Sequence, residues 1–199
     1  QSTVHSTLSV FAADVDGDGD TDLLASTSNT DDVLWYQNNG VPLFIEHWIG
    51  GVDSGYRIHA ADVDGDGDVD PLVADFADNQ ISWFENECGT PEPTFTPRPT
   101  TSPQPTPVPS YDTPAPTGTP SYATAAADVD RDGAVDVLFS ASATDTVAVL
   151  FNDGSQTFTE TVISSSADDA WYAEVGDVDG DADVDVLSAA RTGNELVWW

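Results

Sequence analysis

Four stretches of the chain repeat an acidic pattern whose residue types could bind a metal ion. The first reads Asp-Val-Asp-Gly-Asp-Gly-Asp-Thr-Asp over residues 14–22, and related stretches span residues 62–70, 128–136 and 177–185. Each lies between two short apolar segments, so we predict four loops that join strands. Carboxylates at positions 1, 3, 5 and 9 would surround a hard cation with oxygen atoms. Calcium accepts roughly six to eight oxygen ligands in irregular geometry, whereas magnesium demands a near-ideal octahedron.

Two other positions of the pattern also favour calcium. Position 7 is Asp in three loops and Ala134 in one, as expected if only its backbone carbonyl coordinates the ion. Position 6 is Gly in three loops, where we predict a sharp turn with positive φ, while Ala182 makes the fourth loop the weakest prediction. The predicted ligands of up to four calcium ions are Asp14, Asp16, Asp18, Asp20, Asp22; Asp62, Asp64, Asp66, Asp68, Asp70; Asp128, Asp130, Asp132, Ala134, Asp136; and Asp177, Asp179, Asp181, Asp183, Asp185.

Two alternative interpretations of the pattern are weaker. A single loop of this kind could be a solvated acidic turn, but four copies that keep the Asp spacing favour calcium. A helix-flanked calcium loop needs a Glu at position 12. That position holds Ala25, Val73, Phe139 and Ser188, and the flanking residues are typical of strands, so this second alternative is excluded.

The charge balance of the chain limits its partners. The 199 residues include 36 acidic residues against four arginines, for a formal net charge of −32. More than half of the acids lie in the four loops, so we expect calcium to be part of the fold, with the loops splaying apart without it. Nucleic acid and anionic membrane surfaces are poor partners for such a chain. No apolar run is long enough to span a bilayer.

The cysteine content, the chain start and the calcium loops each bear on the origin of the chain. Cys88 is the only cysteine, so the chain has no internal disulfide. The chain begins at Gln1 and contains no methionine, from which we expect a processed chain or a piece of a longer one. Weak calcium loops suit millimolar calcium, which favours a location outside the cell or at its surface.

The acidic loops recur within a larger repeat of short strands. In the first repeat we predict strands over residues 9–13, 23–26, 33–36 and 44–49, with turns rich in Gly, Asn and Asp between them. No segment shows a convincing helical period. Repeated four-stranded meanders predict an all-β fold of β-propeller-type blades, in which four antiparallel units of three to four strands form a small closed ring, a partial ring, or a ring completed by another chain.

The predicted organisation comprises four repeat units and one linker. Unit 1 spans residues 1–50, unit 2 spans 51–89, unit 3 spans 122–170, and unit 4, which is incomplete, spans 171–199. Aromatic residues recur at fixed distances from the loops, for example Tyr56 and Trp171 before them and Trp35 and Trp198 after them. We interpret these aromatic residues as packing between blades.

Residues 90–121 form a linker or insertion rich in Pro, Thr and Ser. All but two of the 13 prolines lie in it, a composition that favours extended polyproline II and cannot form a core. It is either a flexible spacer or an O-glycosylated stalk. The candidate glycosylated residues are Thr94, Thr96, Thr100, Thr101, Ser102, Thr106, Ser110, Thr113, Thr117 and Thr119. Thr94-Phe95-Thr96 also resembles the start of the last strand of unit 3 at Thr157-Phe158-Thr159.

The acidic loops, each followed by an apolar strand, resemble the FG-GAP/VCBS repeats of integrin α-subunit propellers and of many secreted proteins. The resemblance covers nearly the whole chain apart from the Pro/Thr tract. It implies a β-propeller fold with calcium in the loop between the first two strands of each blade, bound by the Asp positions named above. Members of the family often have seven blades, so four units imply a fragment, a small or open ring, or completion between chains.

The sequence leaves three classes of function to compare. An enzyme is the weakest, because Cys88 has no evident activating partner, His5, His47 and His59 lack metal-ligand spacing, and the Asp clusters are explained by calcium. A carbohydrate-binding propeller is a rival, with Trp48, Trp171 and Trp199 as candidate sugar-stacking residues. The leading hypothesis is a non-enzymatic extracellular protein with a structural or adhesive role. It could self-associate head-to-tail into an O-glycosylated surface filament, or bind extracellular glycans or proteins; the chain could also be a fragment of a larger secreted adhesion protein.

Overall fold

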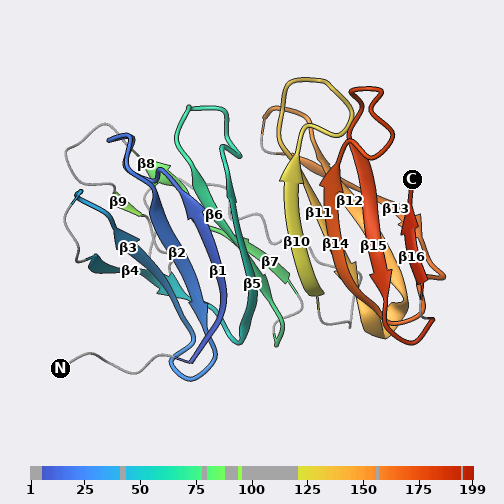
Figure 1. The fold of residues 1–199 in the computed structure, drawn as a ribbon, viewed down its shortest axis with the longest axis horizontal. Coiled ribbons are helices and arrows are strands. Elements are labelled where there is room, and N and C mark those ends of the chain that lie inside the picture. The colour runs from blue at the N-terminus through green and yellow to red at the C-terminus, as the bar shows by residue number, and fades with distance from the viewer. Residues whose placement is uncertain are drawn as a thin grey trace.

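Four small antiparallel sheets make up the chain, as seen in a computed structural model that describes residues 6–40, 44–77, 80–87, 94–95, 121–155, 157–193 and 195–199 (Figure 1). The sheets are numbered below as blades 1 to 4. The predicted all-β class of β-propeller-type blades is confirmed. The only helical element in the described residues is the short 3-10 turn η1 (Ser142–Thr144), so none of them forms a helix that could cross a membrane.

Blades 1 and 3 are four-stranded meanders, and blades 2 and 4 have three strands each in the described residues. Blade 1 contains β1 (Thr7–Ala13), β2 (Asp22–Thr27), β3 (Asp32–Gln37) and β4 (Ile45–Gly51). Blade 2 contains β5 (Gly55–Ala61), β6 (Asp70–Asp75) and β7 (Gln80–Trp83). Blade 3 contains β10 (Ser121–Ala127), β11 (Asp136–Ala141), β12 (Thr146–Asn152) and β13 (Phe158–Ser164). Blade 4 contains β14 (Ala170–Gly176), β15 (Asp185–Ala190) and β16 (Glu195–Trp198).

Blade 2 continues into a small hairpin of β8 (Asn86–Glu87) and β9 (Thr94–Phe95). Asn86 pairs with Phe95 here, just as Asn152 pairs with Phe158 in blade 3. The similarity between the two Thr-Phe-Thr segments therefore reflects the same strand pairing. β9 stands at the repeat position where the fourth strand of blade 3 begins, and residues 90–93 and 96–120 of the Pro/Thr tract lie outside the described residues.

The second strand of every blade begins before the apolar run that follows the loop, because the last aspartate of each acidic loop already belongs to that strand. Asp22, Asp70, Asp136 and Asp185 are the first residues of β2, β6, β11 and β15. Pro71 is consequently the second residue of β6. Its carbonyl accepts a hydrogen bond from the Phe84 N–H at 2.9 Å.

The first strand of every blade contains a bulge at the same place. The register shifts between Thr7 and Ser9, Gly55 and Arg57, Ser121 and Ala123, and Ala170 and Tyr172. The extra residue in each case is the one at the fixed distance before the acidic loop: Leu8, Tyr56, Tyr122 or Trp171. A bulge re-aims its side chain and increases the local twist. The recurring aromatic position is thus a bulge position.

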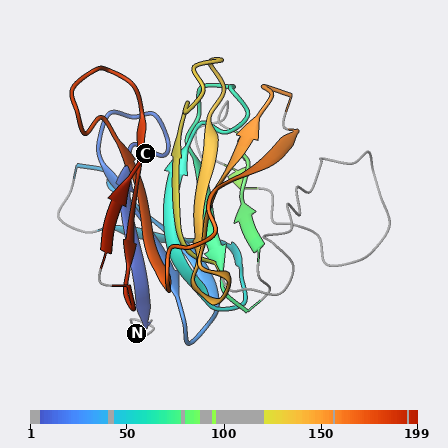
Figure 2. The same cartoon turned by 90° about the vertical axis from the view of Figure 1, so that its right-hand side faces the viewer.

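The blades form an open arc with three interfaces. The first strands line the inside, where β1 packs against β5, β5 against β10 and β10 against β14, with no comparable contact between β14 and β1 in the described strands. Three apolar clusters join blades 1 and 2, 2 and 3, and 3 and 4 respectively. Of the ring forms we predicted, the described chain shows the partial one. In both views the four loops from first to second strand lie at the upper end of the molecule (Figures 1 and 2).

Two blades that are not neighbours also meet on the inside of the arc. The Arg57 guanidinium of blade 2 lies 4.4 Å from the centre of the Tyr172 ring of blade 4 and donates to its hydroxyl at 2.9 Å. The Tyr56 and Trp171 rings approach edge-on at 6.2 Å. These contacts show that the arc curves tightly enough for side chains to cross it.

Candidate metal centres

All four acidic loops share one hydrogen-bond network, in which carboxylates accept backbone N–H groups of their own loop. The position-1 carboxylate accepts the N–H of position 6, at 3.0 Å from Gly19 to Asp14 and 3.1 Å from Ala182 to Asp177. Position 3 accepts from position 5, and position 5 accepts from position 7, at 2.8–3.3 Å across the four loops. The local chain therefore folds its own aspartates toward one centre.

The position-9 aspartate links each loop to the sheet. Its Oδ2 accepts the N–H of position 2, at 3.1, 3.0, 2.8 and 2.7 Å in the four loops. In loops 1, 2 and 3 its Oδ1 also accepts the backbone N–H of an asparagine that follows or ends the third strand, as with Asn86 on Asp70 at 2.8 Å. Asp22, Asp70 and Asp136 are fully buried. These side chains fix the loop, and with it the other acids, at the end of the sheet where the first and second strands are joined.

In each loop at least three carboxylates have oxygen atoms within 4.8 Å of one another. The groups are Asp14, Asp16 and Asp18; Asp62, Asp64 and Asp66; Asp128, Asp130 and Asp136; and Asp177, Asp179 and Asp185. Together they use positions 1, 3, 5 and 9, the four positions at which we expected side-chain ligands. Position 7 contributes to none of them. An all-oxygen donor set of this kind suits Ca²⁺.

Two further observations fit a cation. In loop 3, the Oδ1 atom of Asp128 is buried and has no hydrogen-bond partner among the described residues, so a bound ion would give it one. In loop 2, burial raises the pKa of Asp70 from 3.8 to about 8, although two backbone N–H groups act in the opposite direction. Burial likewise raises the pKa of Asp136 and Asp64. A cation would offset this cost by stabilising the ionised carboxylates.

The backbone of each loop passes through the left-handed region twice. Position 6 has φ of 92°, 100° and 96° at Gly19, Gly67 and Gly133, as predicted, and 72° at Ala182. The fourth loop keeps the shared conformation despite its alanine. Position 4 also has positive φ, which we did not predict from the sequence. It is Gly in three loops and Arg131, with φ of 66°, in the third.

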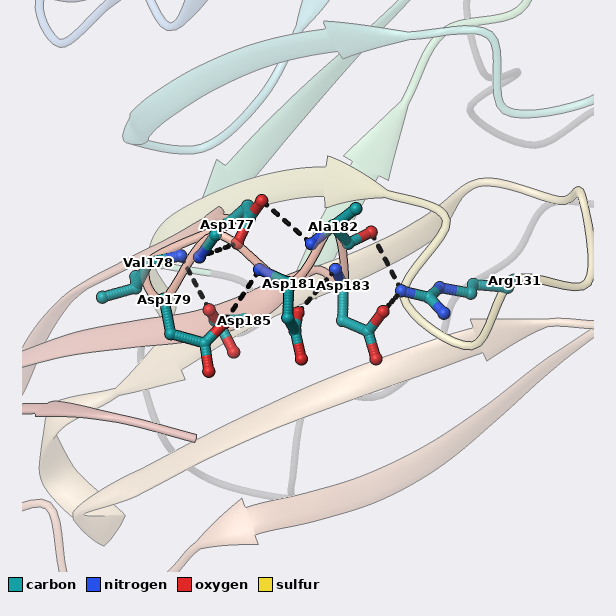
Figure 3. Close-up of polar contacts among 9 residues, drawn as sticks. Arg131, Asp177, Val178, Asp179, Asp181, Ala182, Asp183 and Asp185 are labelled. Atoms are coloured by element: carbon teal, nitrogen blue, oxygen red, sulfur yellow. Dashed lines mark hydrogen bonds and ion pairs between the residues drawn. The ribbon is translucent and has the colours of Figure 1, made fainter.

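Arg131 connects the third and fourth loops. Its guanidinium donates to the Ala182 carbonyl at 2.9 Å and forms an ion pair with the Asp183 carboxylate (Figure 3). Asp183 is at position 7, so the pairing leaves the carboxylates of positions 1, 3, 5 and 9 to the centre of loop 4. In the sequence, Arg131 was visible as the only residue other than Gly at position 4.

A second set of residues that we did not predict from the sequence joins blades 2 and 3 to the blades before them. The Asn86 amide donates to the Val15 carbonyl of loop 1 at 2.9 Å and to the Val69 carbonyl of its own loop at 3.2 Å. Asn152 repeats this with Val63 and Val135 at 3.0 and 3.2 Å. Asn38, Asn86 and Asn152 stand at the same distance after their loops, which was the available signal.

The other predicted site residues do not converge on a second centre. The exposed Trp48 donates to the Asp32 carboxylate at 2.8 Å, and Trp171 lies under the Arg191 guanidinium at 4.3 Å. The exposed Trp199 pairs through its backbone with Val186. His47 stacks on Trp35, and His59 lies against Phe11, each at 4.4 Å between ring centroids.

Several predictions concern residues that cannot be placed. His5, Cys88 and every candidate glycosylation residue except Thr94 lie outside the described residues. Thr94 is the first residue of β9.

A sequence model of the FG-GAP-like repeat matches residues 14–73 and 128–188, which together exceed half of the 199 residues. Each matched segment begins at one acidic loop, includes the following acidic loop and ends in the strand after it. A comparison with curated proteins found no match.

Solved structures with the same fold include three proteins of different kinds. BBS1N, crystallised in complex with ARL6DN, has a TM-score of 0.58 at 13% identity, covering 98% of this chain and 56% of its own. An Agrocybe aegerita lectin specific for non-reducing terminal N-acetylglucosamine has a TM-score of 0.56 at 19% identity, covering 93% and 47%. The V. cholerae biofilm matrix protein Bap1 has a TM-score of 0.50 at 18% identity, covering 96% and 26%. The chain spans about half the length of the first two, and at these identities the likeness concerns the fold alone.

Proposed function

The chain belongs to the FG-GAP-like repeat family, and from this premise we propose that it is a non-enzymatic, calcium-binding extracellular protein with a structural or adhesive role. The observation that carries the proposal is the fourfold repetition of one loop geometry, with the acids of positions 1, 3, 5 and 9 gathered at each site. A site that recurs in every blade fits a structural role, in which each ion would stabilise its own blade.

Calcium is the cofactor that this arrangement favours. Up to four ions would bind, and together they would offset a quarter of the formal net charge of −32. The buried, partnerless Asp128 Oδ1 supports a cation in loop 3, and the loops' oxygen-only donor set favours calcium over softer metals. An ion that binds only the folded chain adds stability by mass action.

The described side chains support a non-enzymatic role. His47 and His59 pack against aromatic rings, and the clustered aspartates are assigned to calcium. The proposed extracellular location is supported by the family resemblance and by the suitability of exposed calcium loops for millimolar calcium. We further propose that the Pro/Thr tract is O-glycosylated, which its composition supports.

Self-association is the partner class we favour, and it could produce a head-to-tail surface filament. We favour it because blades 1 and 4, at the two ends of the arc, each have a neighbouring blade on only one side in the described chain. One structural neighbour is a biofilm matrix protein, which supports an adhesive or matrix role as an analogy of fold. The proposal includes extracellular glycans and proteins as a second class of partner.

A carbohydrate-binding propeller is the second candidate. Another structural neighbour is a lectin, and Trp48 and Trp199 expose 57% and 41% of their surface. On a glycan array, binding of one glycan class that is lost in W48A or W199A would favour this alternative. The absence of binding to any glycan would leave the structural role in place.

Calcium titration by calorimetry tests the main proposal. We expect up to four ions per chain, and one fewer when Asp62 and Asp64 of loop 2 are both changed to Asn. The matched control is Glu160→Gln, an exposed acid on β13 outside all four loops, which should leave the number of bound ions unchanged. A folded chain that binds no calcium would contradict the proposal.

A further inference from the structure

Neighbouring blades pack in one repeated way. Between blades 1 and 2, Leu24, Val33 and Trp35 of blade 1 share an apolar cluster with Ile58 and Val73 of blade 2. Between blades 3 and 4, the residues at the same repeat positions again meet: Leu138, Val147 and Val149 cluster with Ala173. We call the side of a blade that meets the next blade its forward face, and the side that meets the preceding blade its backward face.

The forward face of blade 4 is an apolar surface with no blade packed on it in the described chain. It consists of Val178, Leu187, Leu196 and Trp198, at the repeat positions of Val15, Leu24, Val33 and Trp35 in blade 1. The blade 1 residues are at most 1% exposed, whereas Leu196 is 77%, Trp198 48% and Val178 46% exposed. The same repeat positions that form an interface in blade 1 therefore face solvent in blade 4.

The backward face of blade 1 is uncovered at its inner edge. Val10 is 63% exposed, although its repeat equivalents Ile58 and Ala173 are 2% and 0% exposed. Ala12 is also exposed and Tyr36 is half-buried, while the equivalent Ala60 and Phe84 of blade 2 are buried against blade 1. Ala25 on the second strand of this face is buried within the chain, so the uncovered part of the face lies at the first strand.

Blades 1 and 4 also leave one hydrogen-bonding pair of the repeated interface unused. Asn86 and Asn152 each donate to a loop carbonyl of the preceding blade, namely those of Val15 and Val63. Asn38 of blade 1 has the equivalent position and donates to Thr21 of its own loop at 3.0 Å, with no preceding blade to reach in the described chain. The carbonyl at the matching position of blade 4 belongs to Val178.

We propose that the forward face of blade 4 docks onto the backward face of blade 1 of a second copy of this chain. The contact would repeat the three blade interfaces within the chain, with Leu196 and Trp198 entering a cluster beside Val10, and Asn38 reaching the Val178 carbonyl. This inference rests on the proposed structural role and deepens it by naming the partner and both surfaces. It rests on the packing of blade faces, so a failure to assemble is distinguishable from a failure to bind calcium.

The repeat explains why a second copy fits these faces. Every interface in the described chain joins one forward to one backward face, and one of each is left over. Such a contact is heterologous, so it forms a closed ring if the rotation closes and a filament if it does not. Calcium favours it by reducing the repulsion between two strongly acidic chains.

Single-face variants and their mixture test the proposal by sedimentation velocity in calcium. Wild type should form particles of at least twice the mass of one chain. Leu196→Glu blocks the forward face and Val10→Glu the backward face, so each variant alone should stay at the mass of one chain. An equimolar mixture restores one intact interface between two different copies, and it should therefore give a two-chain particle.

Val162→Glu is the matched control. Val162 is 51% exposed on β13, outside the two end faces, so this variant should assemble as wild type does. Circular dichroism and calcium titration of each variant separate loss of assembly from loss of fold or of calcium. Wild type that stays monomeric with calcium bound would overturn the proposal while leaving the proposed calcium binding intact. A mixture of folded single-face variants that stays monomeric would overturn it as well.

Discussion

Position 6 of the acidic loops shows how strongly the repeated loop geometry sets backbone conformation. Gly19, Gly67, Gly133 and Ala182 all have φ between 72° and 100°. A side chain in this left-handed region costs roughly 1–2 kcal/mol, while glycine does not. The alanine in loop 4 is therefore held in place by the hydrogen bonds from its own loop, including the one to Asp177.

Exchanging glycine and alanine at this position should change stability in opposite directions in two loops. Ala182→Gly relieves the left-handed strain, but glycine also gives the unfolded chain more conformational entropy. The net effect should be a rise of about 0.5–1 kcal/mol in the free energy of unfolding. Gly133→Ala should lose about 1 kcal/mol or more, although nothing lies within 4 Å of the added methyl group. Urea unfolding in saturating calcium measures both. Equal effects of the same sign would contradict this explanation.

Asp70 should make the calcium-free chain less stable as pH rises. Burial raises its pKa from 3.8 to about 8, so the folded state holds its proton more tightly than the unfolded state. The stability from this proton is fully present below about pH 4 and is lost as pH rises through about 8. Asp136 and Asp64 act in the same direction.

Thermal unfolding of calcium-free protein at pH 5 and pH 7.5 checks this prediction. We expect the lower melting temperature at pH 7.5, and a smaller difference in Asp70→Asn. Saturating calcium should reduce the difference in wild type, since the ion stabilises the ionised carboxylate. A calcium-free melting temperature that rises with pH would contradict the assignment.

At the scale of elements, blades 2 and 3 are each connected to the preceding blade through an asparagine that follows or ends the third strand. Asn86 is fully buried there, and its amide bonds to two carbonyl groups from two different blades. The backbone N–H of Asn86 itself donates to Asp70 of the acidic loop. One short segment thus joins the sheet, its own loop and the preceding loop.

Asn86→Ala should therefore destabilise the chain by about 2 kcal/mol, because it leaves two carbonyls without this donor. Asn38→Ala is the matched control. Asn38 has the same repeat position but its amide donates to the Thr21 carbonyl of its own loop, so we expect a loss of about 0.5–1 kcal/mol. Urea unfolding at low protein concentration measures both. Similar losses would show that the contact between blades contributes little.

The bulges in the first strands are a second feature at this scale. They place Tyr56 and Trp171 on the inside of the arc, where the two rings meet across it. The sequence led us to interpret this aromatic position as packing between blades. The structure supports contact between blades 2 and 4, which are not neighbours, whereas Leu8 at the same position of blade 1 is 45% exposed.

At the scale of the whole molecule, removal of calcium should lower the stability of all blades together. The three apolar clusters run from one blade to the next, so a blade that opens also uncovers its neighbour. The loops without calcium contain closely spaced like charges, which favour the unfolded state. In chelator we expect one cooperative unfolding transition at a lower temperature than in calcium. Differential scanning calorimetry measures it. Calcium added back should restore the original transition, whereas magnesium at the same concentration should restore less. An unchanged melting temperature in chelator would contradict a structural role for the ion.

The sequence alone determined the local features of this protein. The spacing of Asp14 to Asp22 and its three copies predicted loops between strands, positive φ at position 6 and acids gathered at positions 1, 3, 5 and 9. These features depend on contacts within nine residues, so one repeat contains the necessary information. The alternation of short apolar runs and turns likewise predicted antiparallel blades.

Only the tertiary structure decided how the blades meet. The open arc, the inward bulges, the Asn86 contact and the link from Arg131 to loop 4 all join residues that are far apart in the chain. Leu196 and Val33 occupy the same place in the repeat, yet one is exposed and the other buried, because burial depends on whether a further blade packs against that face. That is a property of the assembled molecule, and no local pattern contains it.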